Sequence, residues 1–224
     1  MLLVEVIKSI FKKSVASESQ FTPSIDSRNA VLNVGGGNKT IQIPGHYHNW
    51  RHLLLDIDQR GDADIVMDAR KLKTLPMGQF DAVYCSHNLE HYFRHDVANV
   101  LSGFFHVLKP DGFAEIHVPN MRSVLKRFVE TGMEIDDILY ESPSGPISVL
   151  DVIYGWGKQI ESTGVDFYAH KTGFTETSLM AALNRAGFAH VWIAESTDAY
   201  SVGAMAFKKY PTPAQFSLLG LNPA

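Results

Sequence analysis

Five short apolar runs recur along the first half of the sequence, each bounded by polar or turn-forming residues. Near-continuous Val, Ile and Leu runs of this length are typical of buried strands in a parallel sheet. They lie at residues 31–34, 53–55, 65–67, 81–85 and 113–118. Between the fourth and fifth runs, apolar residues recur at helical spacing from Val97 to Leu108, which predicts an amphipathic helix lying on the sheet. The pattern predicts an α/β fold.

The last third of the sequence returns to the same rhythm. Thr175 is suited to cap a helix, Gly187 to end it, and Phe188 to pack back on that helix beyond the glycine. Two further strands are expected at 190–195 and 201–208, and the polar turn between them is short enough to make them antiparallel. We expect this hairpin to close the sheet.

The stretch between the fifth strand and that last helix interrupts the rhythm. We expect one helix over 122–130 and another over 134–140, with the Pro- and Gly-containing segment 142–146 following them. Just before the fifth strand, residues 109–112 (Lys-Pro-Asp-Gly) are expected to form a turn. Residues 121–170 are interpreted as a lid or acceptor-binding insertion.

This gives a provisional division of the chain. Residues 1–29 form an N-terminal helix and linker, 30–210 the main domain, and 211–224 a tail that docks on the domain or on a partner. The apolar face of the N-terminal helix carries Leu3, Val6, Ile7 and Ile10. We expect it to pack on the domain or a partner subunit, and a membrane surface remains the alternative.

Composition narrows the classes of partner. With 224 residues and 45% hydrophobic residues the chain can form one domain with a substantial core. A formal charge of −4 without a basic run argues against nucleic acid as the main partner, and no apolar run is long enough to span a membrane. The single cysteine, Cys85, fits a reducing compartment, so a cytoplasmic location is expected. A homodimer is left open.

Ligand-binding residues are expected where the first three strands end. The first run stops at Gly35-Gly36-Gly37, and the next two stop at Asp56 and Asp68. The carboxyl ends of parallel strands share one edge of the sheet, where an acid at the tip of the second strand can accept hydrogen bonds from ribose hydroxyls. A dinucleotide is disfavoured because Thr40 replaces the last glycine of its fingerprint and Pro44 leaves no room for a normal helix. A merely flexible turn is the simpler alternative.

Three histidines between the glycines and Asp56 raise the question of a metal. His46, His48 and His52 have no acid or cysteine joining them at regular spacing. Zinc sites usually have three or four well-placed ligands. We therefore expect no metal here.

Six motifs in order resemble those of class I S-adenosylmethionine-dependent methyltransferases, in particular a type 11-like bacterial subgroup. They span about residues 30–208: the glycine-rich run 31–37, the acid-containing Leu55–Asp58, Asp68-Ala69, the fourth-strand motif 80–91 ending in Leu-Glu-His, the turn 108–112, and the last-helix pattern 170–188. Asn33 and Lys39 depart from the family pattern. The resemblance implies a Rossmann-like, doubly wound, mostly parallel seven-stranded sheet with a C-terminal antiparallel hairpin.

The resemblance also implies the cofactor and its contacts. S-adenosyl-L-methionine would be held at the glycine loop, the ribose acid, the adenine contact and the end of the fourth strand, namely Asn33, Gly35, Gly36, Gly37, Asp56, Ile57, Asp58, Asp68, Ala69, Cys85 and Ser86. Methyl transfer is in-line, so the protein mainly supplies alignment. His87 and His170 are the candidate bases, because histidine titrates near neutrality. Each could instead be bonded into the fold, while His91 and His95 are expected to cap or pack.

The acceptor is expected to be a small polar molecule such as a sugar or metabolite. The candidate acceptor-binding residues lie in or beside the insertion: Asn120, Tyr154, Trp156 and Lys158. Tyr and Trp there could equally fill a local core. A cofactor-binding but non-catalytic regulatory or scaffolding relative is the alternative function.

Overall fold

The protein is built on one seven-stranded sheet with the strand order β3-β2-β1-β4-β5-β9-β8. The computed structural model describes residues 27–194 and 199–222. Its strands are β1 (Ala30–Val34), β2 (Arg51–Asp56), β3 (Ile65–Val66), β4 (Phe80–Ser86), β5 (Leu108–Pro119), β8 (His190–Ala194) and β9 (Ser201–Phe207). The first five are parallel, and β9 pairs antiparallel with both β5 and β8. The predicted Rossmann-like sheet and its C-terminal hairpin are confirmed.

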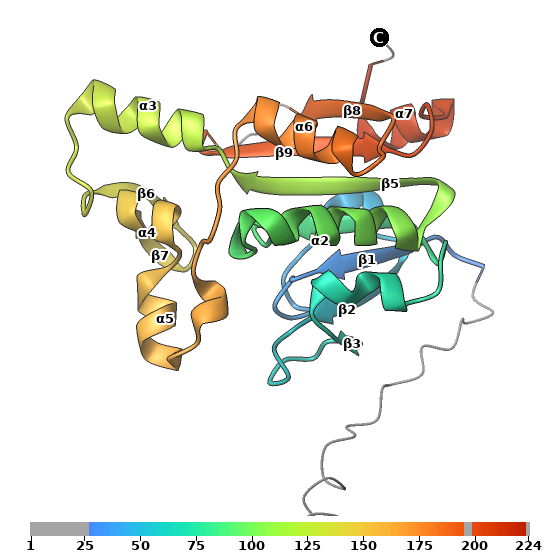
Figure 1. Cartoon of the computed structure of the whole chain (residues 1–224), viewed down its shortest axis with the longest axis horizontal. Helices are drawn as coiled ribbons and strands as arrows, with labels where there is room; N and C mark the ends of the chain where they lie inside the picture. The colour runs from blue at the N-terminus through green and yellow to red at the C-terminus, as the bar shows by residue number, and fades with distance from the viewer. Residues whose placement is uncertain (1–26, 195–198, 223–224) are drawn as a thin grey trace, which may run out of the picture.

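One face of the sheet carries the main core. Helices α2 (Arg94–Val107) and α6 (Glu176–Arg185) lie along it, together with the 3₁₀ turn η2 (Ala69–Thr74) (Figure 1). The predicted helical stripe of α2 is buried on the strands, as Val97, Val100, Leu101 and Phe104 show. Burial of this stripe, rather than helix propensity, is what stabilises such a helix.

The opposite face is covered differently. The connection from β1 to β2 contains only the 3₁₀ turn η1 (Gly45–Tyr47), as expected from the lack of room for a helix. Tyr47 and Trp50 from this connection pack on the sheet, and helix α7 (Pro213–Leu219) covers the rest of the second cluster. Within it, the carboxylate of Glu115 accepts hydrogen bonds from Tyr47 at 2.8 Å, His46 at 2.9 Å and His117 at 3.0 Å. The β1–β2 connection is thereby fixed against the sheet.

The predicted boundaries of the last helix are confirmed. Thr175 and Ser178 form a reciprocal capping box at the start of α6. Beyond Gly187 the amide of Phe188 donates to the carbonyl of Leu183 at 3.3 Å, as in a Schellman stop.

The fifth strand is longer than predicted. β5 begins at Leu108, so residues 109–112 belong to the strand and not to a separate turn. The register between β4 and β5 shifts between Phe80 and Ala82, and this irregularity accommodates the Pro-Asp-Gly sequence within the strand.

The insertion lies beyond the edge at which the parallel strands end (Figure 1). It contains α3 (Met121–Thr131), the hairpin β6 (Ile138–Ser142) and β7 (Gly145–Ser148), α4 (Val149–Tyr154), α5 (Gly157–Thr163) and the 3₁₀ turn η4 (Asp166–Tyr168). The predicted first helix is confirmed as α3. The predicted helix over 134–140 is wrong, because residues 138–142 pair antiparallel with 145–148.

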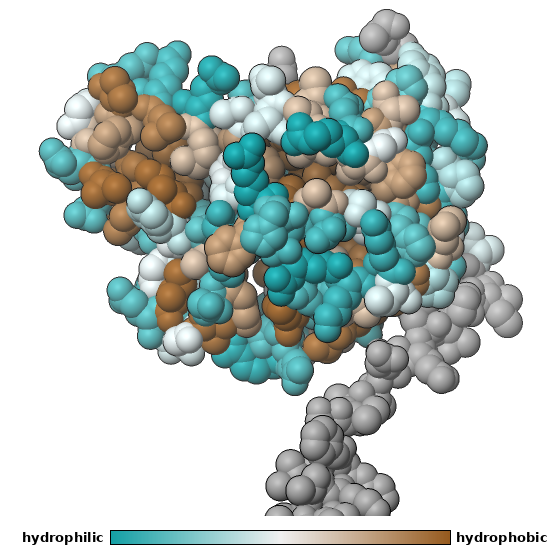
Figure 2. Space-filling model, in the orientation of Figure 1, coloured by the Kyte–Doolittle hydropathy of each residue, from teal (hydrophilic) through white to brown (hydrophobic). Residues whose placement is uncertain are grey.

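The insertion has a small core of its own, which explains the hairpin. Val124, Val149 and Val152 are buried there, with Leu139, Tyr140 and Ile147 packed against them. Packing of the hairpin side chains against residues of α3 and α4 overrides the local propensity. Other apolar side chains of the insertion remain exposed, among them Val129 and Ile138, and Figure 2 shows apolar residues gathered over α3 and β6.

The predicted N-terminal helix and most of its linker lie outside the described residues. Among the described helices, none is long and apolar enough to cross a membrane. The predicted tail contains α7, whose Phe216 packs edge-on against Trp192 of β8 with ring centroids 5.8 Å apart.

Candidate active site

Two asparagine side chains pack directly against the backbone of the glycine loop that follows β1. Gly35 and Gly37 have positive φ angles of 72° and 73°, a conformation that favours glycine. A Cβ on Gly35 would lie 2.1 Å from Nδ2 of Asn88, and one on Gly36 would lie 2.2 Å from Nδ2 of Asn33. Glycine is therefore required here for close approach as well as for the turn.

The acid at the end of β2 is oriented by the backbone around it. One oxygen of Asp56 accepts from the amide of Gly37 at 3.0 Å, and the other accepts from the amide of Asp58 at 2.9 Å. The residue is only 8% exposed. Each carboxylate oxygen has two acceptor positions, so the group can still accept hydrogen bonds from a ligand.

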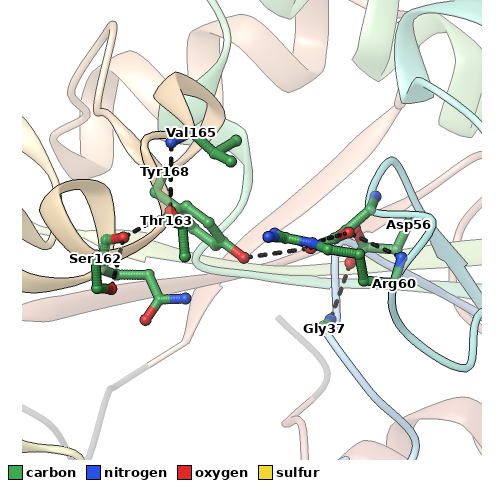
Figure 3. A network of polar contacts seen from close by, with 9 residues as sticks. Gly37, Asp56, Arg60, Ser162, Thr163, Val165 and Tyr168 are labelled. Carbon is green, nitrogen blue, oxygen red and sulfur yellow. Dashed lines mark hydrogen bonds and ion pairs between the residues drawn. The ribbon is translucent and has the colours of Figure 1, made fainter.

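A second acid links this edge to the insertion. Asp58 holds the guanidinium of Arg60 at 2.6 Å, and its oxygen Oδ2 lies 3.5 Å from the hydroxyl of Tyr168. Hydrogen bonds from Arg60 are the main reason that the pKa of Asp58 falls to about 2. Figure 3 shows Tyr168 reaching from the insertion towards Arg60, beside Asp56 and Gly37.

The acid after β3 is already paired. Asp68 accepts from Nε and from Nη2 of Arg70 at 2.8 and 2.6 Å, and Arg70 also contacts Asp96 at 3.2 Å. An adenine contact by Asp68 would have to share this carboxylate with Arg70. The side chains of Ala69 and Cys85 are buried in the main core, which leaves only their backbone groups for a ligand.

Three consecutive residues at the end of β4 line three separate cavities. Ser86 lines a cavity of about 340 Å³ with Asn33 and the three glycines. Asn88 lines another of about 340 Å³ with Ile57 and Asp68. His87 lines a third, of about 270 Å³.

The third cavity lies between the sheet edge and the insertion. Its wall includes Tyr140, Trp156, Tyr168 and His170 from the insertion, Tyr200 and Ser201 from the start of β9, and His87, Glu90 and His91 after β4. The two candidate bases, far apart in the sequence, are thus brought into one cavity. His87 adopts a left-handed backbone with φ of 49°, and its Nε2 lies 3.4 Å from the hydroxyl of Ser201.

His170 has a defined tautomer. Its Nδ1 donates to the carbonyl of Val152 at 2.8 Å, which leaves Nε2 as the nitrogen with a lone pair. Burial lowers the pKa of His170 below the usual value, so the ring is neutral at pH 7 and can accept a proton or a cation.

Three of the predicted acceptor-binding residues lie outside this cavity. Asn120 is buried at the start of α3, where it caps the helix and donates to Glu176 at 2.7 Å. Tyr154 and Lys158 are exposed on α4 and α5. Of the four, only Trp156 lines the cavity.

Sequence reasoning missed Glu90 and His91 as parts of the site. Both belong to the Leu-Glu-His motif after β4, the signal that could have identified them. The other histidines are separated: His46 contacts Glu115, His48 is exposed and His52 is half-buried in β2. Among the described residues these three do not form a cation site.

Comparisons with known proteins identify the type of domain. Fold and site together define a Rossmann-like domain with its ligand edge at the glycine loop and its open flank under the insertion. The family model of the methyltransferase domain matches residues 35–116, from the glycine loop to β5. The chain resembles class I S-adenosylmethionine-dependent methyltransferases, as its motifs predict, and this domain implies S-adenosylmethionine as the cofactor.

Solved structures share the fold at low sequence identity. The PH0226 protein of Pyrococcus horikoshii OT3 is 16% identical with a TM-score of 0.53, over 92% of this chain and 90% of that one. A SAM-dependent methyltransferase of Methanosarcina mazei is 15% identical with a TM-score of 0.51, over 82% of this chain and 94% of that one. No curated protein sequence matches the chain closely enough to count as a relative.

Proposed function

We propose that the protein transfers the methyl group of S-adenosylmethionine to a small polar acceptor bound in the cavity under the insertion. The observation that carries this proposal is the position of Ser86, His87 and Asn88. Three successive residues face the glycine-loop cavity, the acceptor cavity and the cavity beside Ile57. A donor spread over the first and third of these would present its reactive centre to the second.

The cofactor contacts follow from this placement. The glycine loop with Asn33 and Ser86 would hold the methionine end, Asp56 and Asp58 the ribose, and Ile57, Asp68 and the backbone of Ala69 the adenine. Asn88 lies against Gly35 between the two cofactor cavities. Its Oδ1 is buried and has no hydrogen-bond partner among residues 27–194 and 199–222, so we assign Asn88 a direct contact with the cofactor.

The acceptor cavity favours a compact molecule with polar groups. Its volume of about 270 Å³ is small for a ligand site, and aromatic rings from the insertion face histidine and carboxylate side chains across it. Such a wall suits one sugar or heterocyclic ring. Residues 121–170 therefore form the acceptor side of the site. Asn120, Tyr154 and Lys158 could contact the acceptor, as predicted, only if it extends beyond the cavity.

The chemistry needs few protein groups. A lone pair of the acceptor forms the new bond to the methyl carbon as the carbon–sulfur bond breaks, and the bonding electrons remain on sulfur. The proton of an acceptor hydroxyl or amine passes to a histidine, for which His87 and His170 are the candidates. Alignment of donor and acceptor in the cavity supplies most of the acceleration.

Calorimetry with the purified protein tests the cofactor. We expect saturable binding of S-adenosylmethionine and S-adenosylhomocysteine, and weak or no binding of NAD. Binding of NAD but of neither sulfur nucleotide would overturn the proposal.

Turnover separates an enzyme from a non-catalytic relative. With donor labelled in its methyl group and a metabolite extract, we expect a labelled small molecule together with free S-adenosylhomocysteine. Cofactor binding without transfer to any fraction would favour the regulatory or scaffolding alternative. The homodimer stays a prediction, which light scattering of the full chain can test.

A further inference from the structure

A buried carboxylate lies at the wall of the acceptor cavity with histidine rings beside it. Glu90 is 1% exposed, and neither of its carboxylate oxygens has a hydrogen-bond partner in the described part of the chain. Its closest cationic candidates are Nδ1 of His87 at 3.6 Å and Nε2 of His170 at 3.9 Å. A buried charge of this kind is costly unless it is paired or coordinates a metal.

Two histidines present ring nitrogens to this carboxylate. One nitrogen each from His91 and His170 and one oxygen of Glu90 all lie within 4.8 Å of one another. The two rings meet edge to face with centroids 4.8 Å apart. Two imidazoles and one carboxylate are a ligand set that suits divalent first-row transition metals.

The far nitrogens of both rings are bonded as they are in metal sites. His91 donates from Nδ1 to the carbonyl of Ala169 at 3.2 Å, and His170 donates from Nδ1 to Val152 at 2.8 Å. Metal-ligating histidines almost always donate their other ring N–H to a carbonyl or carboxylate, which fixes the tautomer and the ring orientation. In both rings Nε2 is then the nitrogen available to an ion.

The backbone holds the three side chains in one frame. The carbonyl of Glu90 accepts from the amides of Lys171 and Thr172 at 2.8 and 3.2 Å. Residues 169–172, which we call the return strap, therefore run beside the 3₁₀ turn η3 (Leu89–His91). Ligands from two distant parts of the sequence are pre-positioned by main-chain bonds.

We propose that Glu90, His91 and His170 bind one divalent transition-metal ion at the wall of the acceptor cavity. In a tetrahedral zinc site with bonds of about 2.1 Å the ligand atoms lie about 3.4 Å apart. The side chains must therefore draw together by at most about 1.4 Å. All three residues line the cavity, so the remaining coordination position opens to the acceptor.

The role of the ion rests on the proposed methyl transfer. An acceptor oxygen at the open position would be oriented and polarised, because a bound cation lowers the pKa of a hydroxyl or water that it coordinates. His170 is then a ligand, and His87 is the histidine that remains to take the proton.

Metal binding is measured on the full chain after removal of metals with a chelator. Titration with Zn²⁺ followed by calorimetry, and with Co²⁺ followed by visible absorption, is expected to show one ion per chain. Glu90→Gln, His91→Ala and His170→Ala should each raise the dissociation constant about a hundredfold or more. His95→Ala is the matched control, since this exposed histidine lies in the first turn of α2, close to His91 in the sequence, and should leave the affinity unchanged.

Thermal melts distinguish a variant that has lost metal binding from one that does not fold. A cooperative melt of metal-free Glu90→Gln shows that the variant folds, and added Zn²⁺ should raise the Tm of the wild type only. Absence of an ion at one equivalent, or equal binding by the wild type and the three variants, would overturn the proposal. Calorimetry with S-adenosylmethionine on the metal-free protein tests the methyltransferase proposal separately.

Discussion

Backbone amides, rather than other side chains, can orient an acidic group at this site. Asp56 is the clearest case, because Gly37 and Asp58 donate to its two oxygens from either side. The carboxylate cannot turn away from the sheet edge without breaking both bonds. A ligand therefore meets an acceptor group whose orientation is already fixed.

Replacing that carboxylate should weaken cofactor binding. For Asp56→Ala we expect a loss of about 1.5 to 3 kcal/mol in the binding free energy of S-adenosylmethionine, the range for hydrogen bonds to a charged group. Calorimetry measures the change. Asp111→Ala, on the exposed start of β5, is the control, and an unchanged affinity in Asp56→Ala would move the ribose contact to Asp58.

His87 is expected to act in the chemical step and not in cofactor binding. His87→Asn keeps a residue that tolerates the left-handed backbone, so the change is confined to the side chain. We expect turnover to fall about 10² to 10⁴-fold with the affinity for S-adenosylmethionine unchanged. Label transfer in single-turnover assays measures the rate. A decrease no larger than that of His95→Asn would contradict this role.

Glu115 should make the protein sensitive to acid. Burial opposes its ionisation, but hydrogen bonds from His117, His46 and Tyr47 outweigh burial and bring its pKa to about 2. Since the folded pKa lies below the unfolded value, ionised Glu115 stabilises the fold above about pH 4.5, and this stabilisation is lost as the pH falls towards 2.

The size of this effect follows from the shift of the pKa, and amounts to roughly 3 kcal/mol at neutral pH. Urea unfolding of the wild type and of Glu115→Gln measures it. The wild type should be the more stable protein at pH 7, and the difference should narrow by about half or more at pH 3. A difference independent of pH would show that packing, not ionisation, is lost.

At the scale of elements, periodicity predicted the parts of the fold in which one face is buried. The stripe of α2 and the cap and stop of α6 are examples, because each depends on residues close together in the sequence. The hairpin β6–β7 was missed since its strands pack on α3 and α4 rather than on the sheet. The pairing of Asp68 with Arg70 was also missed, although the two residues are close in sequence.

The site shows the same limit. The glycine loop and Asp56 could be predicted, because each follows directly from a strand end. The placement of His170 and His87 in one cavity could not be predicted, since it depends on the path of the insertion. Gly155 illustrates the cause: a Cβ there would lie 2.3 Å from the carbonyl of Tyr168, so this glycine lets the return strap pass close to α4.

The insertion should retain the cofactor as well as line the acceptor cavity. The hydroxyl of Tyr168 contacts Asp58 across the sheet edge at 3.5 Å. A single long hydrogen bond contributes about 0.5 to 1 kcal/mol, so Tyr168→Phe should speed release of S-adenosylmethionine about two- to fivefold. Stopped-flow displacement measures the release. Tyr154→Phe, on the same insertion but outside the cavity, should leave the release rate unchanged. Equal effects of both variants would contradict a role for the contact between Tyr168 and Asp58 in retaining the cofactor.

At the scale of the whole molecule, the described chain is one sheet with an insertion over its ligand edge. The sheet supplies the rigid part, and the insertion has only a small core of its own. Fold and cofactor edge were predictable because six motifs occur in order along the sheet. The acceptor cavity is defined by the packing of the insertion, which no short motif encodes.

The strand order also determines when the sheet can be completed during synthesis. β9 lies between β5 and β8, and every one of its residues is buried. Until residues 201–207 have left the ribosome, the long edge of β5 has no partner on that side. An unpaired strand edge is prone to pair with other chains. The nascent protein therefore passes through a stage at which the edge of β5 is unpaired, and the sheet is completed by the last of the described strands to be made.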